Sequence, residues 1–123
     1  MAASQRLEAV SAPVRTVHTF TIPKGLATEV QTVGFHQLTT SEERQALKAA
    51  SGDTAKAMYE QIKHSIAEVN GKPVSVADGS TDKVWETMDP RVRTLCMAAY
   101  QKLHIPENDA VEDFLKSQAH RVG

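Results

Sequence analysis

The stretch from Trp85 to Leu115 constrains the fold of this chain more than any other part. It contains the only Trp and the only Cys among 123 residues. Asp89 followed by Pro90 predicts a helix start, because Asp caps free first-turn N–H groups and Pro already has a helical φ. Apolar residues then recur at three- and four-residue spacings, namely Val92, Leu95, Cys96, Ala99, Tyr100 and Leu103. This spacing predicts a helix with one apolar stripe, packed on a core.

The end of that helix is also marked in the sequence. Ile105 precedes Pro106, and proline disfavours helical geometry in the residue before it. A further helix is predicted to carry Val111, Phe114 and Leu115. Cys96 lies on the apolar stripe, so we predict a buried, unreactive thiol.

The N-terminal part has the pattern of a β-hairpin. Residues 14–22 and 29–36 are rich in β-branched and aromatic residues, and a turn signal at residues 23–25 separates them. We predict a hairpin within residues 13–37, preceded at residues 1–12 by an arm that is mobile or ordered by a partner.

Two histidines of the predicted hairpin are candidates for a metal site. A hairpin symmetric about Ala27 would place His18 opposite His36. No third ligand falls at suitable spacing, and two imidazoles are too few for a closed zinc site. We therefore predict no metal and no cofactor.

The rest of the chain is predicted to be mainly helical. Thr39 with Glu42 and Thr40 with Glu43 both fit a capping box, so a helix should begin here and run to about Ala50. Its inward-facing residue is predicted to be Leu47.

A second helix is predicted over residues 54–68, with Asp53 as its cap. Ile62 and Ile66 should face the core, and Glu60 and Lys63 should form an ion pair on the exposed face.

The connection to the C-terminal half contains turn signals. Asn70-Gly71 is the strongest of them, because both residues tolerate positive φ, and a short edge strand is predicted within residues 72–76. The predicted fold class is thus α+β. An N-terminal β-hairpin is followed by a predominantly α-helical part of four to five helices at residues 38–123, and residues 13–123 form a single domain.

No pattern in the chain points to catalysis. The sequence lacks a glycine-rich phosphate loop and the common metalloprotease and nucleophile motifs. His64 with Glu60 or Glu68 is interpreted as a salt-bridge arrangement rather than an acid–base pair. We predict that the protein is not an enzyme.

Charge and hydropathy bear on the classes of partner. The net charge of −1 gives no electrostatic case for nucleic acid or a membrane surface, and no apolar run is long enough to span a bilayer. Arg91, Arg93, Lys83 and Lys102 could form a small basic patch, which leaves a DNA-associated module as a minor alternative.

The order of features resembles a known class of protein. The segments are LTTSEERQALKAASGD, then SIAEVNGKPVSVADGSTDKVWETMDPRVRTLCMAAYQKLHIP, then DFLKSQAHRVG. Over residues 38–117 they are similar to small tail-associated proteins of tailed bacteriophages, of the tail-assembly chaperone type. Proteins of this class can have a frameshifted C-terminal extension. The C-terminal end of this sequence shows no sign of one, so we do not extend this property to the chain.

The resemblance implies a non-enzymatic role in tail morphogenesis. Proteins of this type bind other tail proteins, in particular the tape-measure protein, in the host cytoplasm during assembly. The alternative is a virion structural subunit of the tail, baseplate or neck, in which the hairpin edge adds to a neighbour's sheet. Self-association as a homo-oligomer is left open.

Six residues are predicted to contact a partner. Four of them are apolar and lie where helices begin or end, and two are arginines beside a helix start; they are Trp85, Met88, Phe114, Leu115, Arg91 and Arg93. Trp is enriched at interfaces. By contrast, Leu95, Ala99 and Leu103 are interpreted as intramolecular core.

Overall fold

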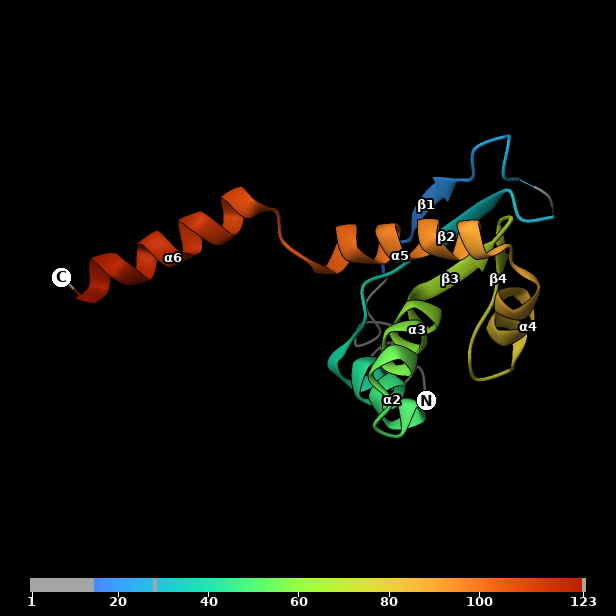
Figure 1. The fold of residues 1–123 in the computed structure, drawn as a ribbon, viewed down its shortest axis with the longest axis horizontal. Helices are drawn as coiled ribbons and strands as arrows, with labels where there is room; N and C mark the ends of the chain where they lie inside the picture. Colours follow the sequence, from blue (N-terminus) through green and yellow to red (C-terminus); the bar gives the residue numbers. More distant parts are fainter. Residues whose placement is uncertain (1–14, 28, 123) are drawn as a thin grey trace, which may run out of the picture.

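The protein folds as an α+β domain in which helices pack against a small antiparallel sheet (Figure 1). The computed structural model describes residues 15–27 and 29–122, with side chains up to residue 117. The predicted arm at residues 1–12 lies outside the described residues. The elements are β1 (His18–Thr21), β2 (Thr32–Phe35), α2 (Thr40–Ala50), α3 (Thr54–Ser65), β3 (Ile66–Val69), β4 (Lys72–Pro73), α4 (Ser80–Thr87), α5 (Pro90–His104) and α6 (Asn108–Val122).

The predicted hairpin is formed by β1 and β2. The sheet has the order β1-β2-β3-β4, with every neighbouring pair antiparallel. His18 pairs with Phe35 rather than His36, so the hairpin is not symmetric about Ala27 and the two histidines do not face each other. Gly34 interrupts the β2–β3 register, and a Cβ there would lie 2.8 Å from Val17 Cγ1. The close approach explains why this strand position holds a glycine.

The central strand β3 corrects the prediction of a helix over residues 54–68. The helix ends at Ser65, and Ile66 already has extended φ and ψ. Ser65 is fully buried, and its hydroxyl donates to the His36 carbonyl oxygen at 2.6 Å. The His36 N–H in turn donates to the Ser65 carbonyl. Pairing with β2 therefore stops the helix where local periodicity would have continued it.

The turn after β3 forms as predicted. Asn70 and Gly71 have φ of 52° and 78°, and they connect β3 to β4. The predicted strand within residues 72–76 is short, since β4 contains only Lys72 and Pro73. The Asn70 side chain accepts from the Gln31 and Thr32 N–H groups and donates to the Glu29 carbonyl. It thus ties the β3–β4 turn to the strand on the other side of β3.

The helix boundaries largely follow the sequence signals. Thr39 and Glu42 make the predicted capping box, and Asp53 and Asp89 cap α3 and α5. The inward face of α2 is not as predicted, because Leu47 is 46% exposed while Ala46 and Ala50 are buried. Small residues on this face let α2 pack closely against α3.

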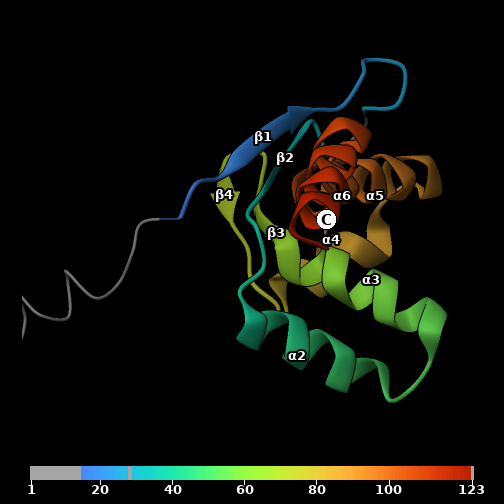
Figure 2. The same ribbon diagram turned by 90° about the vertical axis from the view of Figure 1, so that its left-hand side faces the viewer.

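The core lies between the sheet and the helices, and α5 runs across one face of the sheet (Figure 2). Its buried residues come from the sheet and the helices and from the segments beside them. They are Ile22, Val33, Phe35, Ile62, Ile66, Val69, Trp85, Met88, Val92, Cys96, Ala99 and Tyr100. Phe20 packs edge-on against Phe35, with ring centroids 5.7 Å apart.

Candidate functional site

Helix α6 presents an apolar face that the other described residues do not cover. It follows α5 after residues 105–107 and projects away from the body of the domain (Figure 1). Val111, Phe114 and Leu115 lie on one side at three- and four-residue spacing, and we call them the α6 apolar face. Phe114 is 70% exposed and Leu115 is 56% exposed. Exposure of such large apolar side chains together is typical of a contact surface.

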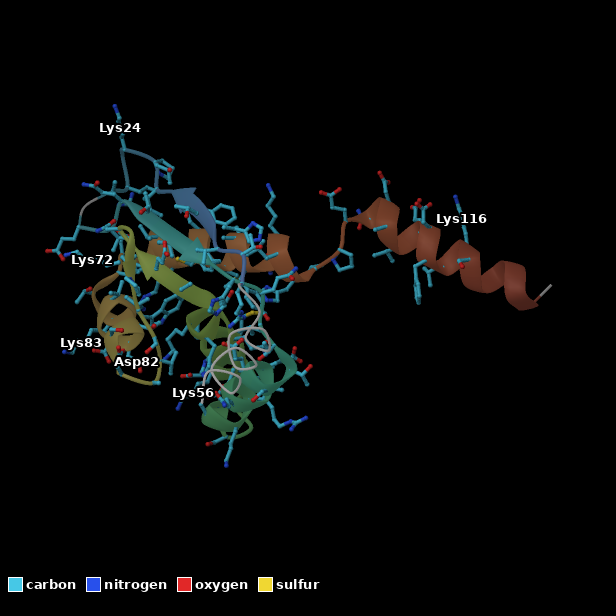
Figure 3. The ribbon with its side chains drawn as sticks, turned by 180° about the vertical axis from the view of Figure 1, so that it is seen from behind. Lys24, Lys56, Lys72, Asp82, Lys83 and Lys116 are labelled. Carbon is cyan, nitrogen blue, oxygen red and sulfur yellow. The ribbon has the colours of Figure 1, made fainter. Side chains whose placement is uncertain are left out.

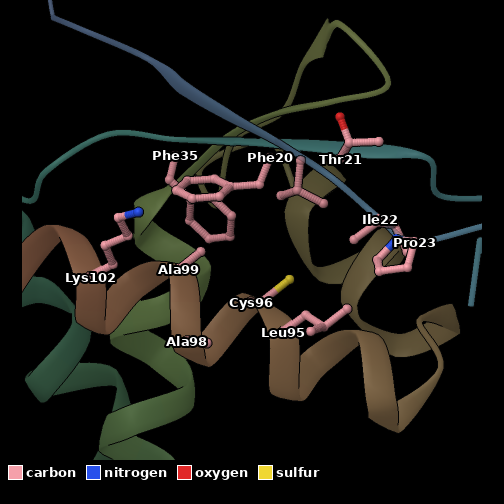
Figure 4. A pocket seen from close by; sticks show the side chains of 11 residues that line it. Phe20, Thr21, Ile22, Pro23, Phe35, Leu95, Cys96, Ala98, Ala99 and Lys102 are labelled. Carbon is pink, nitrogen blue, oxygen red and sulfur yellow. The ribbon is translucent and has the colours of Figure 1, made fainter.

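A second feature is an apolar groove of about 280 Å³ between β1 and α5 (Figure 4). We call it the β1–α5 groove. Its main lining residues are Phe20, Ile22, Pro23, Phe35, Leu95 and Ala98. Of the described residues that line it, Lys102 is the charged one, and its side chain extends along one end of the groove. The groove therefore suits an apolar side chain beside a negative charge.

Two of the predicted partner-binding residues belong to the core instead. Trp85 and Met88 are buried. The Trp85 ring packs 5.8 Å from Tyr59, and the Cys96 thiol donates to Met88 Sδ at 3.7 Å. Because neither side chain offers surface to a partner in this conformation, their burial corrects the prediction that they contact one.

The two predicted arginines differ in their surroundings. Arg91 is exposed and pairs with Asp89 at 3.1 Å. Arg93 lies over the Trp85 ring at 5.3 Å and donates from Nε to the Trp85 carbonyl oxygen at 2.9 Å. Arg93 therefore joins the start of α5 to the end of α4, whereas Arg91 keeps an exposed guanidinium.

The expected basic patch requires that its lysines and arginines lie close together on one surface. Lys24, Lys56, Lys72, Lys83 and Lys116 stand on different elements spread over the molecule (Figure 3). Lys102 lines the β1–α5 groove and Arg93 is engaged with α4. Two residues of the expected patch, Lys102 and Arg93, thus lie in different surroundings.

An ion-pair cluster joins α3 to α4. Lys63 Nζ lies 2.9 Å from both Glu60 Oε1 and Asp82 Oδ1. The predicted pair of Glu60 with Lys63 is present, but its expected exposure is wrong, because Glu60 is buried. Burial lowers the pKa of Lys63, but hydrogen bonds to Asp82 and Glu60 outweigh burial and raise the pKa above its usual value. The cluster is a structural contact between helices.

A polar cluster at the start of α2 contains titratable groups. Arg15 forms two contacts with the Glu42 carboxylate, at 2.9 and 2.8 Å. Burial raises the pKa of Glu42, but Arg15 and the Thr39 N–H outweigh it and lower the pKa. His36 Nε2 lies 3.1 Å from the His64 carbonyl oxygen and 3.7 Å from Glu42. Burial and the charge of Arg15 lower the pKa of His36 below its usual value.

We expect the free energy of unfolding to decrease as the pH falls from 6.5 through the lowered pKa of His36. Over that range the unfolded chain binds the proton and the folded chain resists it, so protonation favours unfolding. Urea unfolding at pH values from about 7 to about 5 measures this slope. His36→Asn should make the free energy of unfolding depend less on pH in this range. His18→Asn, at an exposed position on β1, should leave the pH dependence unchanged. An unchanged slope in His36→Asn would assign it to another group.

The described residues contain no group of three His, Cys, Asp or Glu side chains that could hold a metal ion. Cys96 is buried as predicted, and burial raises the pKa of its thiol to about 12. A thiol with this pKa is protonated at neutral pH and is a poor nucleophile. Over the same part of the chain, every helix is too short or too polar to cross a membrane.

The sequence did not reveal the β1–α5 groove. Phe20 and Ala98 are distant in sequence, and Ala98 lies outside the predicted apolar stripe of its helix. The sequence signals that could have located the groove were the strand pattern that predicts β1 and the helix start that predicts α5. Neither signal predicts which face of the helix packs beside the strand.

The comparisons with known proteins do not name a family. No protein-family model matches the chain, and no match was found among the curated proteins or the solved structures. The class supported by the structure is an α+β domain with a projecting amphipathic helix.

Proposed function

We propose that this chain is a non-enzymatic tail-morphogenesis protein of a tailed bacteriophage, of the tail-assembly chaperone type. It acts in the host cytoplasm by contact with other tail proteins, the tape-measure protein among them. The proposal takes the phage context from the resemblance over residues 38–117. The observation that carries the mode of action is the exposed α6 apolar face, with Phe114 and Leu115 at its centre.

A projecting amphipathic helix suits a partner that is itself helical or incompletely folded. Apolar side chains at three- and four-residue spacing enter grooves or pair with other helices without needing a fixed backbone match. Covering apolar surface on an aggregation-prone protein requires this type of contact, and it requires no catalytic group. Phe114 and Leu115 remain the predicted contact residues, and the exposed Arg91 remains a predicted peripheral one.

Co-expression with the tape-measure protein of the same phage tests the proposal. We expect the wild-type chain to keep more tape-measure protein in the cleared lysate and to co-purify with it. Phe114→Asp should abolish both effects, because a carboxylate cannot be buried in an apolar contact without a large desolvation cost.

A matched control lies on the opposite side of the same helix. Asp113 is exposed and is about half a turn from the α6 apolar face, so Asp113→Ala should retain both effects. Equal activity of wild type and Phe114→Asp would contradict the assignment of the contact to α6. Absence of any effect of the wild-type chain would contradict the chaperone role.

The alternative function is a virion structural subunit of the tail, baseplate or neck. One observation favours it, namely that β1 is an edge strand of the described sheet and can accept a neighbour's strand. Mass spectrometry of purified particles separates the two roles. A fixed copy number relative to the major tail protein would favour the subunit, and presence only in infected-cell lysate would favour the chaperone.

A further inference from the structure

We infer that α6 of one copy of this chain binds in the β1–α5 groove of a second copy, and that the exchange is reciprocal. The inference goes beyond the proposed function and does not depend on the phage role. Because both use the α6 apolar face, binding of a second copy and binding of a tail protein at that face exclude each other. The inference rests on two features that the other described residues leave open and that agree in apolar character and in charge.

The chemistry of the two surfaces is complementary. The groove is lined mostly by apolar side chains, among them Phe20, Ile22 and Leu95 (Figure 4). The α6 apolar face offers Phe114 and Leu115, which are the most exposed large apolar side chains of the helix. Bringing the two together removes both apolar surfaces from water.

The charges agree with this pairing. Lys102 is the charged residue among the described residues of the groove. Between Asn108 and Ser117, α6 carries three carboxylates and one ammonium, on Asp109, Glu112, Asp113 and Lys116. Glu112 is three residues before Leu115 and therefore flanks the α6 apolar face. A helix of net negative charge thus meets a groove whose end is positive, which favours this occupant over a basic helix.

The connection between α5 and α6 directs the helix to another molecule. Only residues 105–107 separate the two helices. Ile105 is extended, with φ −108° and ψ 122°, and Pro106 has a restricted φ. The connection carries α6 onward beyond the end of α5, away from the groove on the same chain (Figure 1). A two-fold arrangement of two copies seats both helices at once, which is a low-cost route to a dimer.

Sedimentation velocity of the full chain over a wide concentration range tests the inference. We expect the wild-type chain to be a dimer that dissociates on dilution. Phe114→Asp damages the helix face, and Ala98→Glu places a carboxylate in the groove at an exposed position. Each should weaken dimerisation by at least about tenfold. Asp113→Glu keeps the negative charge of α6 and lies away from the apolar face, so it should change dimerisation by less than about twofold.

A mixture of the two damaged variants supplies the sharper test. The Ala98→Glu copy has an intact α6, and the Phe114→Asp copy has an intact groove. An equimolar mixture should therefore form a heterodimer with one intact helix–groove pair, although each variant alone is monomeric. Far-UV circular dichroism of both variants should match the wild type, because both substituted residues are exposed.

Three results would overturn the inference. The first is a wild-type chain that stays monomeric at every concentration, and the second is a dimer that both variants leave unchanged. The third is a nuclear Overhauser contact between the Phe114 ring and the Ala98 methyl group within the monomer. That contact would show that α6 folds back into the groove of its own chain.

Discussion

Trp85→Ala is expected to lower the free energy of unfolding by about 3–5 kcal/mol, the usual cost of truncating a large buried aromatic residue. Trp85 is only 8% exposed and packs between Tyr59 on α3 and the Arg93 guanidinium on α5. Its removal leaves a cavity where three helices meet and also removes the cation–π contact. Urea unfolding followed by far-UV circular dichroism measures the loss without relying on the tryptophan itself.

The matched control for this prediction is an aromatic residue at the surface. Phe114→Ala removes a ring that is 70% exposed, so at protein concentrations low enough for the chain to be monomeric we expect the free energy of unfolding to change by no more than about 0.5 kcal/mol. The two variants should therefore separate stability from partner binding. If Trp85→Ala left stability unchanged and reduced partner binding, the core assignment of Trp85 would be wrong.

The second large effect is expected at the turn between β3 and β4. Asn70→Ala should lower the free energy of unfolding by about 2–3 kcal/mol for two separate reasons. Its amide makes hydrogen bonds to Gln31, Thr32 and Glu29, and its φ of 52° is unfavourable for alanine. Thermal and urea unfolding both measure this loss.

Two further substitutions at Asn70 separate these causes. Asn70→Gly removes the hydrogen bonds but tolerates the positive φ, so its loss should be smaller than that of alanine. Asn70→Asp keeps an acceptor for the Gln31 and Thr32 N–H groups and loses the donor to Glu29, so its loss should be the smallest. Equal losses in all three variants would assign the effect to the hydrogen bond to the Glu29 carbonyl, which all three remove, and would show that φ and the two accepted hydrogen bonds contribute little.

Much of the fold was predictable from short-range signals. The caps at Thr39, Asp53 and Asp89, the stop at Ile105-Pro106 and the turn at Asn70-Gly71 all act within a few residues. Such signals depend on local hydrogen bonds and allowed φ angles, so they can be read without knowing the rest of the structure. The apolar stripe of α5 was predictable for the same reason, and its Val92, Cys96 and Ala99 are buried.

The candidate site was only partly predictable. Phe114 and Leu115 were predicted as contact residues, and the structure leaves both exposed. Trp85 and Met88 were predicted with them because they also stand near helix ends, yet α4 folds onto the core and buries them. An apolar residue near a helix end has the same sequence pattern in both cases. Its exposure depends on whether another element packs over it.

The sequence by itself determined the capped starts of α2, α3 and α5, the end of α5, the β1–β2 hairpin and the α+β class, because local hydrogen bonds and periodicity encode these features. The tertiary structure alone decided that Ile66–Val69 is a strand, since β2 supplies its hydrogen-bond partners from distant residues. It also decided that Ala46 and Ala50 rather than Leu47 face α3. The β1–α5 groove likewise exists only because packing brings Phe20 and Ala98 to the same surface.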